Sequence, residues 1–142
     1  MSYETLKFEI NNGVGTITLN RPDAANAINI PMAKDLLKVA IECESGAPVR
    51  VLLLKGEGKL FCAGGDLKFI SELDNLRAGL AEMLGYLHSA LGKIDHLDAP
   101  LIGAITGTAA GAGLSLVSAC DLAIAGESVN FTMAYTAAGL TP

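Results

Sequence analysis

Two glycine-containing loops are the parts of this sequence best suited to chemistry. The first runs from Phe61 to Leu67 (FCAGGDL) and the second from Thr106 to Gly113 (TGTAAGAG). Each follows an apolar, strand-like run and precedes a helical pattern. Taken alone, each is also compatible with an ordinary strand–helix turn or with close packing of small residues. If the two loops meet in the fold, two backbone N–H groups can converge on one oxygen and stabilise an oxyanion.

Other kinds of chemistry find less support in the sequence. Gly111-Ala112-Gly113 lacks the third glycine of a dinucleotide-binding fingerprint, and no acidic residue follows at the spacing that this fingerprint requires. Ser115 is not in a nucleophile elbow, because the glycine that should follow it two residues later is a valine. His88 and His96 fall on polar helix faces without a nucleophile beside them, which favours surface roles.

The first elements along the chain are predicted to be a hairpin and a helix. Leu6–Ile10 and Val14–Leu19 are rich in β-branched and apolar residues, and they flank the turn Asn11-Asn12-Gly13. Asn-Gly between such runs is a strong signal for a β-hairpin. Pro31 suits the first turn of a helix, which the apolar spacing extends to about Cys43.

The elements that must position the two loops alternate between strands and helices. Val49–Leu54 is predicted to be a strand buried on both faces, and Pro100–Ile105 is predicted to be a second buried strand. Between them the pattern is helical from Asp66 to about Ile94, with a break near Asp74-Asn75. A buried helix stripe is predicted at Leu76, Leu80, Met83, Leu84, Leu87 and Leu91. The succession predicts an α/β architecture in one domain, residues 1–142.

Composition excludes several classes of protein. Of the 142 residues, 51% are hydrophobic and 18% are charged, which is typical of a folded, core-rich domain. The apolar runs are too short to span a membrane. A net charge of −5 argues against a nucleic-acid partner. Three cysteines in no metal-binding pattern indicate reduced thiols, a cytoplasmic protein and no metal site.

Joined in order, these segments resemble the enoyl-CoA hydratase/isomerase family, also called the crotonase superfamily. The matching segments are Leu19-Asn20-Arg21-Pro22 with Asn26-Ala27, the loop Phe61–Leu67, the run Pro100–Ala104 with the loop Gly107–Gly113, and Ala119–Ala125. The resemblance implies a spiral of repeated ββα units. It also implies coenzyme A thioesters as substrates, with no separate cofactor because coenzyme A is part of the substrate.

The resemblance assigns roles to individual residues. It implies an oxyanion hole made by the backbone N–H groups of Gly65 and Ala112. It places Ala63 and the segment Gly65, Asp66, Leu67, Lys68 along the coenzyme A path, with Arg21, Ala25 and Ala27 near its nucleotide end. Arg21, Lys59 and Lys68 are candidates to offset the phosphates. Family members are about twice this length, so the chain is expected to be the N-terminal half, truncated before a helical part that completes a homo-oligomer, a trimer or a dimer of trimers.

Two departures from the family pattern bear on the reaction. Hydratases of the family use two glutamates, and the matching positions here are Ser115 and Tyr135. A neutral hydroxyl is a poor general base near neutral pH. Isomerase-like members often place one acid directly after a turn like Gly139–Pro142, at what would be position 143. The sequence therefore favours an enoyl-CoA isomerase. A hydratase and a non-catalytic acyl-CoA-binding or assembly member remain open.

Overall fold

A computed structural model of the chain describes residues 2–139. Strands β1 (Leu6–Asn11) and β2 (Val14–Leu19) form the predicted antiparallel hairpin. Asn12 and Gly13 connect them with φ angles of 50° and 83°. Two consecutive left-handed residues match the right-handed twist of the flanking strands, which is why Asn-Gly is favoured here.

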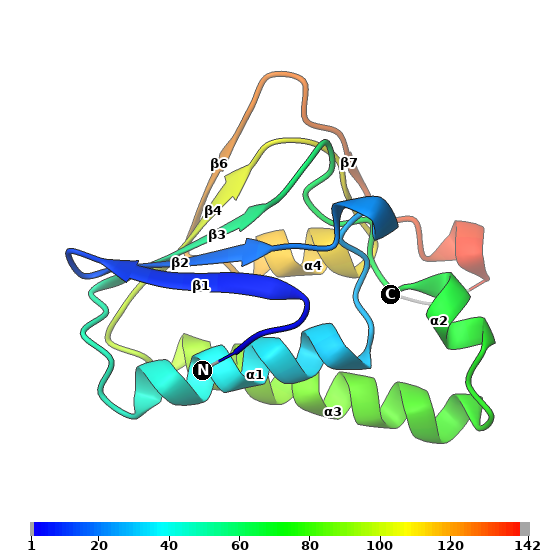
Figure 1. Ribbon diagram of the computed structural model, residues 1–142. Helices are drawn as coiled ribbons and strands as arrows, with labels where there is room; N and C mark the ends of the chain where they lie inside the picture. The colour runs from blue at the N-terminus through cyan, green and yellow to red at the C-terminus, as the bar shows by residue number, and fades with distance from the viewer. Residues whose placement is uncertain (1, 140–142) are drawn as a thin grey trace.

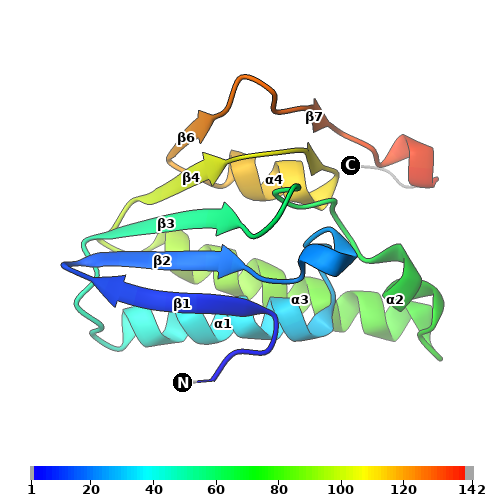
Figure 2. The same ribbon diagram turned by 45° about the horizontal axis from the view of Figure 1, so that its top comes forward.

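The hairpin forms one side of a five-stranded sheet with the order β1-β2-β3-β4-β6 (Figures 1 and 2). The last four strands are mutually parallel: β2, β3 (Val51–Gly56), β4 (Leu101–Ile105) and β6 (Leu122–Ala125). Strand β3 begins two residues later than predicted. It is also not buried on both faces, because only Leu52 and Leu54 are buried, and these alternate residues point toward the helices.

A second, smaller β-sheet lies beyond the carboxyl ends of these strands. Strands β5 (Ala109–Ala110) and β7 (Phe131–Thr132) pair in parallel, and isolated parallel bridges join Ile28 to Gly65 and Cys62 to Ala109. A long strand, a short extended segment and a helix therefore recur along the chain. This is the predicted spiral of ββα units.

Within residues 2–139, four α-helices and two 3-10 helices complete the fold. They are α1 (Ile30–Glu44), α2 (Leu67–Ser71), α3 (Leu76–Asp95), α4 (Ala112–Ser118), η1 (Pro22–Ala24) and η2 (Thr136–Ala138). The predicted break at Asp74-Asn75 separates α2 from α3. Asn75 caps α3, because its side chain accepts a hydrogen bond from the N–H of Ala78 at 3.0 Å.

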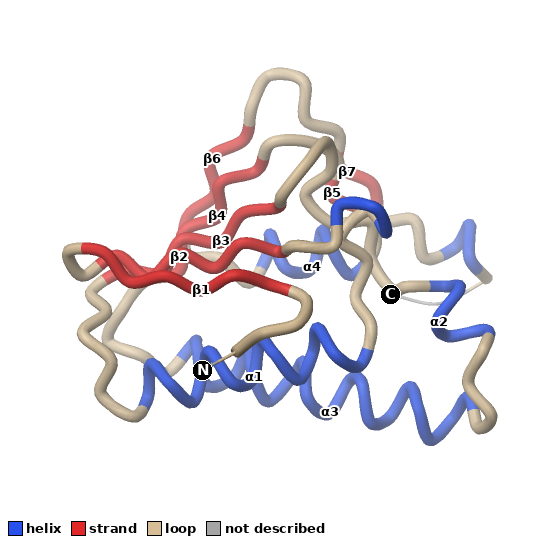
Figure 3. The backbone as a smooth tube through the Cα atoms, viewed as in Figure 1, coloured by secondary structure: helices blue, strands red, loops and turns tan. Residues whose placement is uncertain are grey.

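The core lies between the sheet and the layer formed by α1 and α3 (Figure 3). Helix α3 contributes Gly79, Met83, Leu87, Ala90 and Ile94 to it. The predicted buried stripe is therefore partly wrong. Leu76 and Leu84 are 51% and 42% exposed. The helix face that packs against α1 is instead the neighbouring row of residues, which includes Gly79 and Met83.

A buried carboxylate fixes the N-terminal arm to α1. Asp35 is only 2% exposed, and one of its oxygens accepts hydrogen bonds from the N–H groups of Glu4 and Thr5 and from the Thr5 hydroxyl, at 2.8–2.9 Å. Its other oxygen pairs with Lys38 at 2.8 Å. Burial alone would raise the pKa of Asp35, but the Lys38 ammonium and the Thr5 hydrogen bonds outweigh it and hold the pKa below its ordinary value.

Strand β6 is the far edge of the sheet, and all four of its residues are exposed. Leu122 and Ile124 are 64% and 71% exposed, and Phe131 and Met133 further along the chain are also exposed. Within residues 2–139, no helix combines the length and the apolar character needed to cross a membrane.

Candidate active site

The two glycine loops lie side by side, as the oxyanion hypothesis requires. The N–H of Cys62 donates to the carbonyl of Thr108 at 3.3 Å, and the N–H of Ala110 donates to the carbonyl of Cys62 at 2.9 Å. A Cβ atom on Gly113 would lie 2.2 Å from the Cys62 carbonyl oxygen. The loops approach one another so closely that only glycine fits at position 113.

Gly65 and Ala112 each present an N–H group that other backbone atoms leave unused. In the bridge to Ile28, the N–H of Ile28 donates to the Gly64 carbonyl at 2.7 Å, and the N–H of Asp66 donates to the Ile28 carbonyl at 2.8 Å. The N–H of Gly65, which lies between these two groups in the sequence, takes no part in the bridge. Ala112 is the first residue of α4, where the N–H has no intrahelical acceptor. Neither group donates a hydrogen bond to any residue in the range 2–139.

Both residues line one cavity of about 650 Å³. Its apolar wall comes from α2 and α3 and comprises Leu67, Ile70, Leu80, Met83 and Leu84. The opposite wall contains the glycine loops with Ala63, Ser115, Ala134 and Tyr135, while His88 of α3 lies at an exposed position of the lining. The cavity thus combines an apolar surface with two lining residues whose N–H groups are unused within residues 2–139, and such groups suit a carbonyl that gains negative charge.

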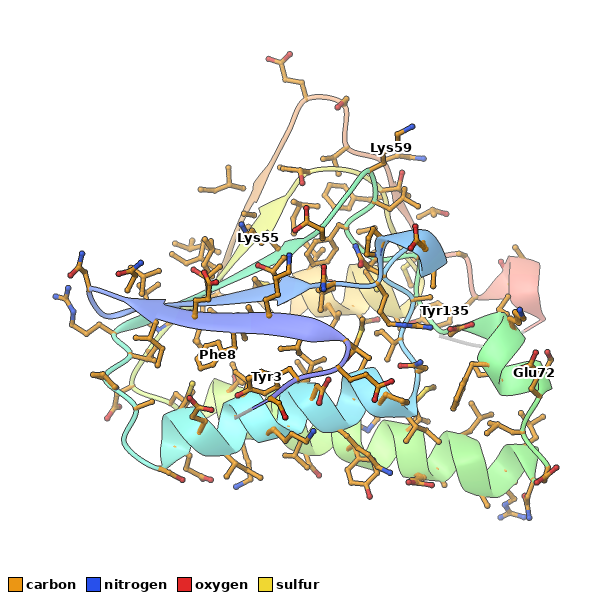
Figure 4. All side chains as sticks on the ribbon, in the orientation of Figure 1. Tyr3, Phe8, Lys55, Lys59, Glu72 and Tyr135 are labelled. Carbon is orange, nitrogen blue, oxygen red and sulfur yellow. The ribbon has the colours of Figure 1, made fainter. Side chains whose placement is uncertain are left out.

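The two residues that the resemblance places at the hydratase glutamate positions are in direct contact. The hydroxyls of Ser115 and Tyr135 are 2.8 Å apart, and either oxygen can be the donor. Ser115 lies three residues after Ala112 on α4, and hence on the same helix face. Tyr135 follows Ala134, whose φ of 53° turns the chain after β7. Figure 4 shows Tyr135 beside the start of α2, consistent with their shared cavity.

The segment before α1 packs against the first loop, where the resemblance places the coenzyme A path. Arg21 pairs with Asp66 at 2.9 Å and also donates to the carbonyl of Ala27, and the Ala25 carbonyl accepts from the N–H of Ala63 at 3.0 Å. The guanidinium of Arg21 therefore holds two segments together. Its predicted contact with phosphates stays a prediction.

Asp66 has two structural roles in the same place. It caps α2 by accepting a hydrogen bond from the N–H of Phe69 at 3.0 Å, and it pairs with Arg21. Burial alone would raise the pKa of Asp66, but the Phe69 N–H and the Arg21 guanidinium hold it below its ordinary value. Asp66 is therefore a carboxylate that fixes the loop. Lys59 and Lys68 are exposed outside the cavity lining, and their phosphate roles stay predictions.

Sequence reasoning missed the part of the cavity that α3 supplies. Leu80 and Leu84 were predicted to belong to a buried stripe and His88 to a plain surface, yet all three line the cavity. Their spacing of four residues places them on one helix face, which is the signal that could have found them. Cys62 lies in the first loop, but burial raises the pKa of its thiol to about 11, so it is no ready nucleophile.

Comparison with known proteins agrees with this geometry. The family model described as enoyl-CoA hydratase/isomerase matches residues 9–142. A probable enoyl-CoA hydratase of Rhodobacter capsulatus is 38% identical over 143 residues, covering 100% of this chain and 54% of the relative. A trans-2-decenoyl-[acyl-carrier-protein] isomerase of Streptococcus mutans is 31% identical over 147 residues, covering 100% of this chain and 55% of the relative.

Among solved structures, an enoyl-CoA hydratase of Mycobacterium smegmatis superposes with a TM-score of 0.90 at 33% identity, covering 96% of this chain and 53% of that one. The chain thus spans about half the length of the relatives it matches. The family match, the spiral fold and the paired glycine loops agree, and the chain belongs to the enoyl-CoA hydratase/isomerase family.

Proposed function

We propose that this chain forms the acyl-CoA-binding half of an enzyme that stabilises a thioester enolate, and that the enzyme is an enoyl-CoA isomerase. The observation that carries the proposal is that Gly65 and Ala112, whose N–H groups donate to no residue in the range 2–139, both line one apolar cavity. These two N–H groups would donate hydrogen bonds to the carbonyl oxygen of the substrate and stabilise it as it becomes negatively charged. The free thiols of the chain support a cytoplasmic protein, and its family supports a homo-oligomer, a trimer or a dimer of trimers, for the full-length protein.

The proposed reaction needs one base that becomes an acid. In a 3-enoyl thioester, the base removes a proton from the second carbon, and the electron pair moves into the carbonyl to give a dienolate. The oxyanion donors hold the negative oxygen during this step. The proton then returns at the fourth carbon, which leaves the double bond between the second and third carbons. We assign the base to a carboxylate at position 143, the position that the family resemblance implies.

Replacement of both hydratase glutamates supports isomerisation over hydration. The Ser115–Tyr135 pair offers hydroxyl groups, which position oxygen atoms but do not readily take a proton from water. A hydratase would require an unfamiliar way of activating water. A non-catalytic acyl-CoA-binding member would keep the oxyanion donors and lack the base.

Incubation of the full-length protein with 3-enoyl-CoA and, separately, 2-enoyl-CoA tests the proposal. Conversion of the first to 2-enoyl-CoA is expected, and removal of the carboxylate at position 143 should abolish it. Hydration of 2-enoyl-CoA would instead identify a hydratase, and tight binding without turnover would identify the non-catalytic member. His88→Gln is the informative companion variant, because an imidazole on the cavity wall is an alternative carrier of the proton.

A further inference from the structure

Most backbone N–H groups of the first glycine loop have a partner in another segment of the chain. Three of the five N–H groups in residues 62–66 donate to distant backbone carbonyls: Cys62 to Thr108 at 3.3 Å, Ala63 to Ala25 at 3.0 Å and Asp66 to Ile28 at 2.8 Å. The other two belong to Gly64 and Gly65, and neither has a backbone acceptor within residues 2–139. Gly64 is buried, so its N–H needs an acceptor from the protein.

The side chain of Cys62 supplies that acceptor. Burial raises the pKa of the Cys62 thiol to about 11, against the opposite effect of a hydrogen bond from the N–H of Gly64, so the sulfur is a neutral acceptor at pH 7. Cys62 is fully buried, and its Cβ lies so close to α4 that a Cβ on Gly113 would be 2.9 Å away. The thiol is therefore fixed between the first loop and the helix that begins at Ala112.

This hydrogen bond restricts a part of the loop that is otherwise free to rotate. Gly64 joins the peptide group that contains its own N–H to the one that contains the Gly65 N–H. Gly64 has a φ of 100° and no side chain to limit its torsion angles. A rotation that gave the Gly64 N–H a different partner would also turn the N–H of Gly65. The thiol opposes this rotation and leaves Gly65 with the one unused N–H in residues 62–66.

We propose that Cys62 is a positioning residue for the oxyanion site, because its thiol takes up the Gly64 N–H and so keeps the Gly65 N–H available to the thioester oxygen. This inference rests on the proposed function, since it needs that oxygen at Gly65 and Ala112. Cys62 is not among the described residues that line the cavity, so it acts through the loop and not on the substrate. A serine hydroxyl at this position could accept the same hydrogen bond, whereas alanine could not.

Steady-state isomerisation of 3-enoyl-CoA by the full-length protein gives the first test. Cys62→Ala should lower kcat roughly tenfold, which is less than the roughly 10²–10³-fold cost of losing a donor outright. KM should stay within about twofold, because the donor acts mainly on the charged transition state. Cys62→Ser should recover most of the lost kcat.

The infrared band of the bound thioester carbonyl gives a second test that does not depend on turnover. The ligand is butyryl-CoA with an isotope label at its carbonyl carbon, which has no double bond to isomerise. N–H donors polarise a carbonyl, so its band should move to lower frequency on binding to the wild-type protein. The movement should be smaller with Cys62→Ala and restored with Cys62→Ser. A loss of stability alone would not change the band of the bound ligand.

Cys43→Ala is the matched control. It removes another buried thiol, on α1 and outside the cavity lining, and both kcat and the carbonyl band should keep their wild-type values. Circular dichroism establishes that the variants are folded. If Cys62→Ala does not fold, Cys62→Thr and Cys62→Val make the same comparison with side chains of equal size. The threonine protein should then have the higher kcat and the larger band shift.

The possible failures are distinguishable. If the band shifts in the wild-type protein and Cys62→Ala keeps the wild-type shift and kcat, the inference is wrong and the proposed function stands. The same holds if Cys62→Ser behaves like Cys62→Ala. If butyryl-CoA does not bind, or binds to the wild-type protein without a band shift, the inference and the proposed function fall together.

Discussion

Replacement of Ala112 by proline should remove one proposed oxyanion donor without breaking the helix that carries it. Ala112 is the first residue of α4, the position at which proline is over-represented, because its fixed φ suits a helix start and the missing N–H has no intrahelical acceptor. Gly111 before it, with no Cβ, adapts to the proline ring more easily than other residues. The change therefore removes the N–H group of a residue that lines the cavity.

The magnitude follows from the role proposed for that N–H. Loss of one oxyanion-hole donor costs about 2.7–4 kcal/mol of transition-state stabilisation, which corresponds to roughly a 10²–10³-fold loss in kcat. The second donor, on Gly65, stays in place, so residual turnover is expected. KM should change less than kcat, because the neutral ground-state carbonyl gains less from the donor than the enolate does.

Steady-state isomerisation of 3-enoyl-CoA by the full-length protein measures the effect, with Ala112→Ser as the control that keeps the N–H and nearly the same volume. The proline variant must retain the wild-type circular dichroism spectrum and thermal midpoint. A folded proline variant whose kcat lies within threefold of the serine control would refute the oxyanion assignment.

Two further outcomes follow from other contacts. Gly113→Ala should destabilise the fold by about 1–3 kcal/mol in urea denaturation, because its Cβ would lie 2.2 Å from the Cys62 carbonyl oxygen. Gly65→Ala is the control and should change the stability little, because its Cβ would meet only the Ile70 side chain, at 3.4 Å. Equal effects of the two substitutions would contradict this account. Since the folded-state pKa of Asp35 is lowered, its stabilising contribution is present above about pH 4 and is lost as the pH falls through that lower value. The difference in unfolding free energy between wild type and Asp35→Asn should therefore shrink on acidification from about pH 6 to pH 3; a difference independent of pH would count against this explanation.

Local signals account for the elements that sequence reasoning predicted correctly. The hairpin depends on the turn at Asn12-Gly13. Its left-handed backbone could be predicted from the two residue types alone, because Asn and Gly are the residues that favour this conformation. The break between α2 and α3 depends on Asn75, a capping residue recognisable without knowledge of the fold. The contact between the two glycine loops could be stated only as a requirement of the oxyanion hypothesis and not predicted. It depends on the bridge between Cys62 and Ala109, which are far apart in the sequence.

Burial was harder to predict, because it depends on which neighbour an element meets. The spacing of Leu76, Leu80 and Leu84 indicates an apolar face on α3, yet α1 covers the adjacent row, and Leu80 and Leu84 line the cavity instead. Leu122–Ala125 is apolar enough for a buried strand but occupies the edge of the sheet. No periodicity in a single chain specifies the order of strands in a sheet.

The exposed edge strand β6 has a consequence for folding during protein synthesis. An edge with unpaired backbone groups and apolar side chains such as Leu122 and Ile124 is a template for pairing with another chain. A newly synthesised chain that has folded as far as β6 carries this edge into a crowded cell, where incompletely covered strands aggregate or engage chaperones. Substitutions in this strand should therefore affect the yield of protein more than its catalytic rate.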